Sequence, residues 1–262
     1  FLVRKAEERF KSEKKGWSAE VIEINVIAPL AKLAFLTMKD EILMFSAQSF
    51  DQAACDTNDA LMTGYISKEV ITSALREEER YMFNHQSFRE YLAAKHLVRT
   101  LAARGKWLKE IQDRFEYWRS IATFVFALLG KEKDDEGQVE VAEAVMKATH
   151  FNKMHRYSHY EVWDWLPSHA FLQMMAELAD ITPSLETCIA THAPPEITVN
   201  YRCSPACMNG VVSLYQRASM KENNVTVVIR GHRSMDMASI TELSKSEHLK
   251  AVELFECKNL RE

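Results

Sequence analysis

His85 is the residue whose type and surroundings point most directly to chemistry. Ser87 and Glu90 follow it with the S/T-x-x-E spacing of a capping box, so we expect a helix with Ser87 as its N-cap. Unpaired amides and the positive dipole end make a helix N-terminus favourable for an anion, and an imidazole can donate a hydrogen bond to a phosphate. The sequence therefore predicts a phosphate contact at His85, although a histidine near a cap is more often a local hydrogen-bonding residue. Apolar residues at helical spacing give the expected helix one apolar face: Phe88, Tyr91, Leu92 and Val98.

A second group has residue types that bind metals. His155 and His159 lie one helical turn apart, with Glu161 and Asp164 close by, so a zinc-dependent hydrolase is conceivable. The H-E-x-x-H pattern is absent, and aromatic residues dominate the segment. We therefore favour a helix–helix interface with the histidines at its rim, built on Tyr157, Tyr160, Trp163 and Trp165.

The cysteines do not indicate a metal site or a disulfide framework. Cys203 and Cys207 lie near His192 in sequence, but their spacing is loose for zinc, and Pro205 between them indicates a turn. An odd number of cysteines suits a reducing compartment. The five are Cys55, Cys188, Cys203, Cys207 and Cys257. We expect no metal ligand in this chain.

The glycine pattern argues against a nucleotide-hydrolysing site within the chain. Such a site needs a glycine-rich loop of the form G-x-x-x-x-G-K-[ST], which does not occur among the seven glycines. Gly105-Lys106 is followed by Trp107, and Gly130-Lys131 leads into an acidic run. We therefore predict that this chain is not an enzyme and has no catalytic residue.

Composition sets further bounds. With 262 residues and 47% hydrophobic content, the chain can form two or three domains. A net charge of -4 argues against a nucleic-acid partner. No apolar run approaches the roughly 18 residues of a membrane span, and no signal peptide is visible, so we expect a cytoplasmic chain without a membrane span. Because it begins with Phe1 and the tail of a helix, we expect it to be part of a larger protein.

Residues 83–94, FNHQSFREYLAA, resemble a family signature. The F-x-H-x-S/T-F-Q-E-[FY]-x-A-A motif is found in the winged-helix domain of NACHT-containing NLR proteins, which are intracellular signalling ATPases with leucine-rich repeats. Arg89 replaces the usual glutamine, at a position that we expect to be peripheral. The matching residues are Phe83, His85, Ser87, Phe88, Glu90, Tyr91, Ala93 and Ala94.

Flanking segments extend the resemblance over roughly residues 20–100. Residues 28–35 are similar to the helix that opens the family's winged helix, and residues 61–66 to the turn before its wing strands. Between them we expect a short strand at 42–45 and then the start of a helix that contains Ser49 and Asp51. The Gly64 turn and a strand over 81–83 should follow.

The family resemblance implies a role for His85 and a set of partners. In the family, the histidine of this motif contacts the β-phosphate of bound ADP and helps to hold the closed, inactive state. By that match, His85 contacts ADP held by an upstream NACHT domain of the same protein. ADP or ATP with Mg²⁺ would bind through that domain and not through this segment alone.

The rest of the chain reads as helices followed by a repeating β pattern. We expect a helix from Ile111 to Gly130, an acidic loop at 131–137, a helix at 139–146 and another at 171–179 that ends near Pro183. Short β-like runs occur at 197–201, 225–229 and 252–254. Their last residues are 28 and 25 positions apart, within the period of 20 to 29 residues of leucine-rich repeats. Residues 249–260 resemble the repeat motif, and helical stretches are expected at 211–218 and 237–244. One or two ordinary βα units are the alternative.

The predicted fold class is mainly α with a C-terminal α/β part. The expected domains are the tail of a helical domain (1–19), a winged helix (20–101), a second helical domain (102–195) and the first leucine-rich repeats (196–262). We expect the sensor portion of an NLR-type innate-immune receptor that self-oligomerises on activation and binds a protein or pathogen-derived ligand through its repeats. The alternative is a nucleotide-independent scaffold for protein interactions.

Overall fold

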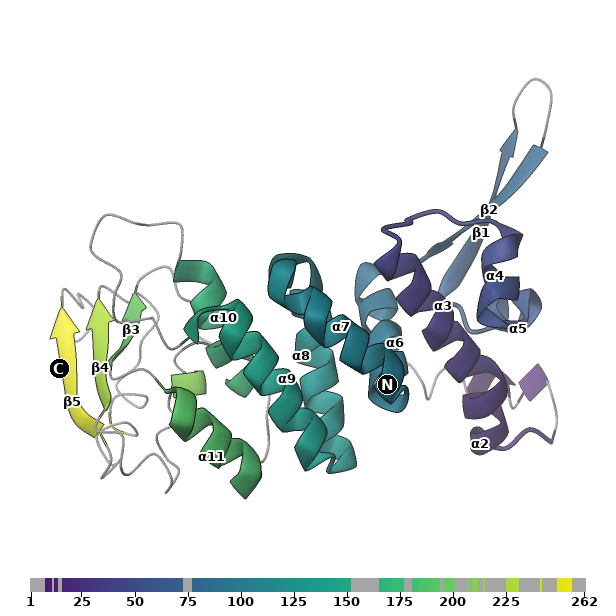
Figure 1. Cartoon of the computed structure of the whole chain (residues 1–262). Coiled ribbons are helices and arrows are strands. Elements are labelled where there is room, and N and C mark those ends of the chain that lie inside the picture. The colour runs from purple at the N-terminus through teal and green to yellow at the C-terminus, as the bar shows by residue number, and fades with distance from the viewer. Residues whose placement is uncertain are drawn as a thin grey trace. The chain divides into compact units, whose positions relative to one another are not determined.

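The computed structural model describes residues 8–10, 12–13, 16–72, 77–151, 165–176, 181–193, 196–200, 207, 209–211, 214, 225–230, 241 and 249–255. The chain divides into two compact units, Phe1–Arg104 and Gly105–Glu262, which are described separately. The described part is mainly helical, with one two-stranded antiparallel sheet and one three-stranded parallel sheet (Figure 1). The mainly helical class is as the sequence predicts.

After helical residues at 8–10 and 12–13, the first unit has a continuous helix in three parts. They are α2 (Ala19–Ile22), the π-helical segment η1 (Glu23–Ile27) and α3 (Ala28–Lys39). The Ser18 side chain caps the start by accepting from the backbone N–H of Val21. Pro29 has no N–H, so the usual α-helical bond to the carbonyl of Asn25 cannot form. The N–H of Ala28, the residue that ends η1, donates to the carbonyl of Glu23, five residues back.

The helix over Ala19–Lys39 corrects one expectation from the sequence. It has 21 residues and a mean hydropathy of 1.7, so by length and composition alone it is apolar enough to cross a membrane. The sequence was expected to contain no such segment. However, 56% of its most apolar window is buried inside the chain, and the core helix of a soluble protein meets the same criterion.

Two short helices and a hairpin follow. These are α4 (Ala47–Ala53), α5 (Thr57–Met62), β1 (Ile66–Thr72) and β2 (Glu77–Phe83), with β1 and β2 antiparallel from the Ile66–Phe83 pair to the Thr72–Glu77 pair. The expected strand at 42–45 is wrong, because only Phe45 forms an isolated bridge, to Tyr81. The expected strand ending at Phe83 is confirmed. The distal part of the hairpin is exposed and extends beyond the helices of this unit (Figure 1).

The core of the first unit lies between α3 and α6 (Gln86–Arg99). Both helices bury one apolar face, as their spacing predicts: Leu30, Leu33, Ala34 and Met38 on α3, and Leu92, Ala93, Leu97 and Val98 on α6. Phe45, Phe50 and Tyr81 form an aromatic cluster where α4 meets the hairpin, with ring centroids 4.9 to 6.4 Å apart.

The second unit contains helices whose limits differ from those expected. α7 (Leu101–Asp113), in which the division between units falls, ends before Arg114, and α8 (Phe115–Glu132) starts after it. Ile111 therefore belongs to a different helix from the apolar series that begins at Phe115. Gly130 lies inside α8, and Lys133 ends the helix with a positive φ of 59°.

The predicted acidic loop at 131–137 is also wrong. α9 (Asp135–Ala148) begins within it, and the Asp134 carboxylate accepts from the backbone N–H of Gly137 at 2.9 Å. The acidic residues are therefore the cap and first turn of a helix, where negative charge is favourable. Two more helices follow, α10 (Trp165–Ala176) and α11 (Pro183–His192). Pro183 opens α11 and does not end a helix, since proline fits the first helical position.

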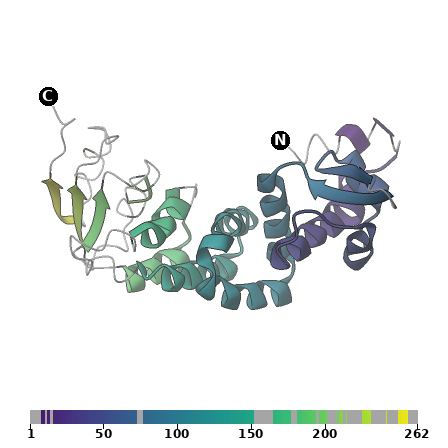
Figure 2. The ribbon, with the colours of Figure 1, turned by 90° about the horizontal axis from the view of Figure 1, so that it is seen from above.

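Three parallel strands end the described chain. β3 (Glu196–Asn200), β4 (Val225–Arg230) and β5 (Leu249–Phe255) lie side by side in that order (Figure 2). All three fall on the predicted β runs. Ile197 pairs with Val227, which pairs with Val252. Of the helical stretches expected between the strands, 211, 214 and 241 are helical, and the remaining residues of both stretches lie outside the described residues.

Candidate functional site

His85 lies at the junction between β2 and α6 and is exposed to solvent. It is itself the N-cap of α6, with an extended backbone, and its carbonyl accepts from the N–H groups of Phe88 and Arg89 at 3.1 and 3.3 Å. The predicted capping box is therefore wrong: Ser87 is the second residue of the helix, and Glu90 accepts a hydrogen bond from Gln86 at 3.2 Å. The side chain of His85 makes no capping bond to its own helix.

Ring contacts hold the His85 imidazole in position. Its ring meets that of Phe88 edge to face, with centroids 4.9 Å apart, and Phe88 meets Tyr65 in the same way at 5.4 Å. Tyr65 is buried, so this series of rings connects the exposed histidine to the core. The imidazole of His85 therefore packs against Phe88 while the residue as a whole stays exposed.

The turn before β1 fixes the backbone next to His85. The N–H of Asn84 donates to the carbonyl of Tyr65, and the Asn84 side-chain amide donates to the carbonyl of Gly64, both at 2.8 Å. Gly64 has a φ of +74°, which favours glycine, and the Arg9 guanidinium lies where a Cβ would stand. The predicted Gly64 turn is confirmed. The role of Asn84 was missed, and an asparagine directly after a strand is the signal that could have indicated it.

Arg89 corrects the expectation that its position is peripheral. Only 3% of its surface is exposed, and its guanidinium donates to the carbonyl of Thr37 near the end of α3. The same carbonyl accepts from the N–H of Ile42 at 2.9 Å. Arg89 therefore joins the first turn of the His85 helix to the end of α3, and the departure from the family motif lies inside the core.

The possible metal ligands do not form a site in the part of the chain that the structure describes. His155, His159, Glu161, Asp164 and Cys203 lie outside it, and no cluster of three potential ligands occurs within it. A ring nitrogen of His192 lies 2.9 Å from the carbonyl of Cys188, on its own helix, and the thiol of Cys207 is buried beside the Gln173 amide at 3.5 Å.

The buried thiols are poor nucleophiles. Burial, with a smaller contribution from Asp56 and Asp59, raises the pKa of Cys55 to about 12. Burial and the nearby Glu143 carboxylate raise the pKa of Cys188 to about 11. Because the thiolate is the reactive and metal-binding form, neither thiol fits a catalytic or redox role.

The geometry at His85 suits binding of an anion. The first N–H groups of a helix have no partner within it. α6 has 14 residues, whose aligned peptide dipoles place a partial positive charge at this end. An exposed imidazole at the same end adds a donor. No protein-family model matches this chain, and no curated protein matches its sequence.

Proposed function

We propose that this chain is the regulatory and sensor portion of an NLR-type signalling receptor of the cytoplasm. In this proposal, residues 20–101 form a winged-helix domain, residues 102–195 a second helical domain and residues 196–262 the first leucine-rich repeats. An upstream NACHT domain of the same protein binds ADP or ATP with Mg²⁺. Ligand binding through the repeats leads to self-oligomerisation.

The observation that carries the proposal is the exposed His85 imidazole at the N-terminus of α6. Its ring is held by Phe88, yet its nitrogens form no cap with its own helix. An imidazole in that place can donate to the β-phosphate of a nucleotide supplied by another domain. The order of elements around it supports the same proposal: a helix, two short helices, a two-stranded hairpin and then α6.

The parallel strands support the repeat part of the proposal. Leucine-rich repeats contribute one strand each to a parallel sheet, with a period of about 20–29 residues. Val227 and its partner Val252 are 25 positions apart, within this range, and Ile197 and Val227 are 30 apart, just beyond it. The buried Ile197 and Val227 give the sheet one apolar face.

In the proposed mechanism, His85 helps to hold the ADP-bound, closed state. A hydrogen bond to a charged group contributes about 1.5–3 kcal/mol. Inverting a 1:99 equilibrium requires about 5.5 kcal/mol. His85 therefore supplies part of the closed-state preference, and packing between domains supplies the rest. Replacing His85 should raise basal signalling without producing full activity.

The experiment compares the full-length protein with its His85→Ala variant. Nucleotide is extracted from each purified protein and quantified, and basal signalling is measured in the absence of ligand. We expect less retained ADP and higher basal signalling in the variant. His150→Asn, which removes another exposed histidine and keeps a residue that tolerates its φ of 51°, is the matched control and should change neither.

Equal ADP retention and equal basal signalling in His85→Ala and wild type would contradict the phosphate contact. The coding sequence upstream of Phe1 gives an independent test. A Walker A motif there supports the nucleotide switch, and its absence supports the nucleotide-independent scaffold instead.

A further inference from the structure

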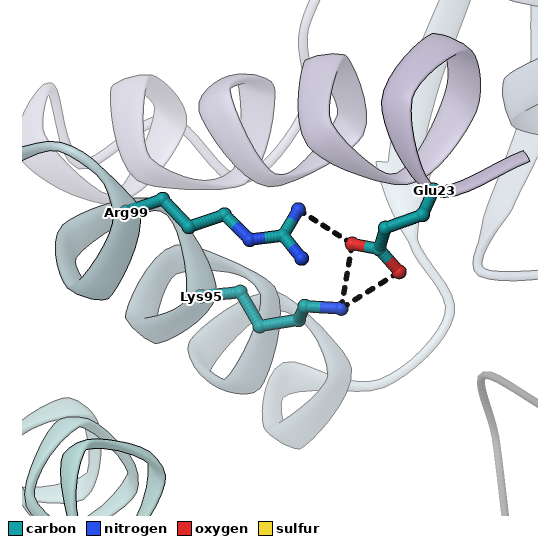
Figure 3. A network of polar contacts seen from close by, with 3 residues as sticks. All are labelled: Glu23, Lys95 and Arg99. Atoms are coloured by element: carbon teal, nitrogen blue, oxygen red, sulfur yellow. Dashed lines mark hydrogen bonds and ion pairs between the residues drawn. The ribbon is translucent and has the colours of Figure 1, made fainter. Parts of the chain in front are cut away.

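Glu23 of η1 lies between two basic side chains of α6 (Figure 3). Its carboxylate oxygens are 2.8 and 3.0 Å from the Lys95 ammonium, and one of them is 2.6 Å from the Arg99 guanidinium. The side chains are 22%, 12% and 39% exposed for Glu23, Lys95 and Arg99 respectively. Lys95 and Arg99 are four residues apart, so both reach the same carboxylate from one face of α6.

The backbone hydrogen bonds of η1 differ from those of an ordinary α-helix. π-Helical geometry is rare and occurs as short segments, often at functional positions. Here it lies directly before Pro29, which cannot supply the next helical hydrogen bond and crowds the preceding turn. The helix therefore has a weak point between α2 and α3, and sharp helix bends occur at such points.

The two sides of this weak point are held differently. α3 is packed along α6 through a long apolar face and is also joined to it by the Arg89–Thr37 hydrogen bond. α2 has only four residues, so once a bend in η1 separates it from α3 it is too short to be a stable helix by itself. Ile22, Val26 and Ile27 bury the inner face of the α2–η1 segment, while Ile24 is 60% exposed.

We propose that η1 is a hinge and that Glu23, Lys95 and Arg99 form the latch that keeps it closed. When the latch is released, α2 and η1 separate from α6 by bending before Pro29, while α3 remains packed. This movement exposes the buried side chains of Ile22 and Val26. This is a local opening of the kind that proteins undergo below the free energy of global unfolding, and it goes beyond the nucleotide contact proposed above.

Because the latch is held by ion pairs, dissolved ions should weaken it. One carboxylate faces two cations, and Arg99 is the most exposed of the three groups. Raising the salt concentration from about 0.1 M to about 1 M shortens the screening length from about 10 Å to about 3 Å. High salt should therefore favour the open hinge.

Hydrogen exchange of the full 262-residue chain, read by mass spectrometry on peptides from each side of Pro29, tests the hinge. In Glu23→Gln, we expect the amides of residues 19–27 to exchange about tenfold faster, as expected for loss of a charge-assisted contact. The amides of residues 30–39 should stay within about twofold of wild type, because α3 keeps its own contacts. High salt should accelerate exchange of 19–27 in wild type more than in the variant.

Two further variants separate the latch from a general loss of stability. Glu23→Lys combined with Lys95→Glu keeps an ion pair between positions 23 and 95 but places a base at position 23 against Arg99, so it should restore part of the slow hydrogen exchange in 19–27. Glu79→Gln removes a different, exposed ion pair with Lys68 and should leave both segments unchanged. Unchanged exchange of 19–27 in Glu23→Gln, or equal acceleration of 19–27 and 30–39, would overturn the proposal. The proposal would also be overturned if the Glu23→Lys, Lys95→Glu double variant restored none of the protection of the amides of 19–27.

Discussion

The Arg89 guanidinium on α6 donates to the backbone carbonyl of Thr37 at the end of α3. The last carbonyls of a helix have no partner within it, and this one also accepts from the N–H of Ile42. A single carbonyl thus joins the end of α3, the following loop and the first turn of α6. His85 lies four residues before Arg89, so this contact also fixes the start of the helix that presents the imidazole.

Replacing Arg89 should destabilise the first unit. We expect Arg89→Gln, which introduces the residue usual in the motif that residues 83–94 resemble, to lower the free energy of unfolding by about 1.5–3 kcal/mol, because a buried charge-assisted hydrogen bond is lost. Urea unfolding followed by fluorescence and circular dichroism measures the change. Arg114→Gln, on an exposed residue of the second unit, is the control. A loss below about 0.5 kcal/mol would show that the contact contributes little.

Substitutions of Gly64 should lower stability mainly because of its backbone conformation, and less because of the space around it. We expect Gly64→Ala to cost about 1–2 kcal/mol, because its φ of +74° is unfavourable for a residue with a Cβ. Arg9 also occupies the Cβ position, but its side chain is flexible and can move. Gly64→Asn should therefore be milder, since asparagine tolerates positive φ. Thermal unfolding of both variants, each with and without Arg9→Ala, distinguishes the two causes. Equal losses for alanine and asparagine would contradict this view.

His96 should make the first unit less stable in mild acid. Burial, and then the nearby Lys32, lowers the pKa of His96 below its ordinary value of 6.5. Since the unfolded chain takes up the proton more readily, stability falls as the pH drops below about 6.5 and continues to fall until the folded protein is also protonated. Its ring packs against Phe35, with centroids 5.2 Å apart, in the contact between α6 and α3.

Lys32→Met tests this assignment. Removing the neighbouring charge should raise the pKa of His96 toward its ordinary value and weaken the dependence of stability on pH. NMR titration of the His96 ring and unfolding curves between about pH 5 and pH 7.5, a range that includes the ordinary value of about 6.5, measure both effects. Lys39→Met removes a lysine at the exposed end of the same helix and should change neither. An unshifted titration in Lys32→Met would refute the contribution of Lys32.

The buried thiols should react slowly until the protein unfolds. At pH 8, well below the pKa of about 11 for Cys188 and about 12 for Cys55, almost no thiolate is present. Glu143→Gln should lower the pKa of Cys188, because it removes the second cause of the upward shift, and should speed its alkylation. Peptide mapping after timed iodoacetamide treatment measures this, with Cys55 as the internal control. Equal rates at Cys188 with and without Glu143 would contradict the effect.

Helices and strands with a strong apolar pattern could be predicted from the sequence, whereas the residues at which they begin and end could not. The apolar spacing of Trp118, Val125 and Leu129 predicts a helix, and the alternating Val225–Ile229 run predicts a strand. Residues on the buried face of a helix recur about every 3.6 positions, and those on one face of a strand about every two. The break at Arg114 has neither glycine nor proline to mark it. A proline after an apolar helical pattern predicts a helix end near Pro183, whereas Thr182 caps a helix that starts there.

The candidate site shows why local signals are insufficient. Ser87 and His85 both stand where an N-cap is plausible, and Ser87 has the better side chain for it. The helix starts earlier because Asn84 is bound to Tyr65 and Gly64, contacts that join residues about 20 positions apart. The buried position of Arg89 was missed for the same reason, since its partner Thr37 lies on a different helix.

The projecting hairpin carries a consequence for solubility. A bare two-stranded ribbon offers unpaired backbone edges to other chains, and Val70 and Ile71 on β1 are exposed. Charged side chains surround them, with Lys68 paired to Glu79 and Arg80 to Glu78. A second ribbon stacking alongside would have to strip water from these ions, so the charges act as gatekeepers against edge-to-edge aggregation.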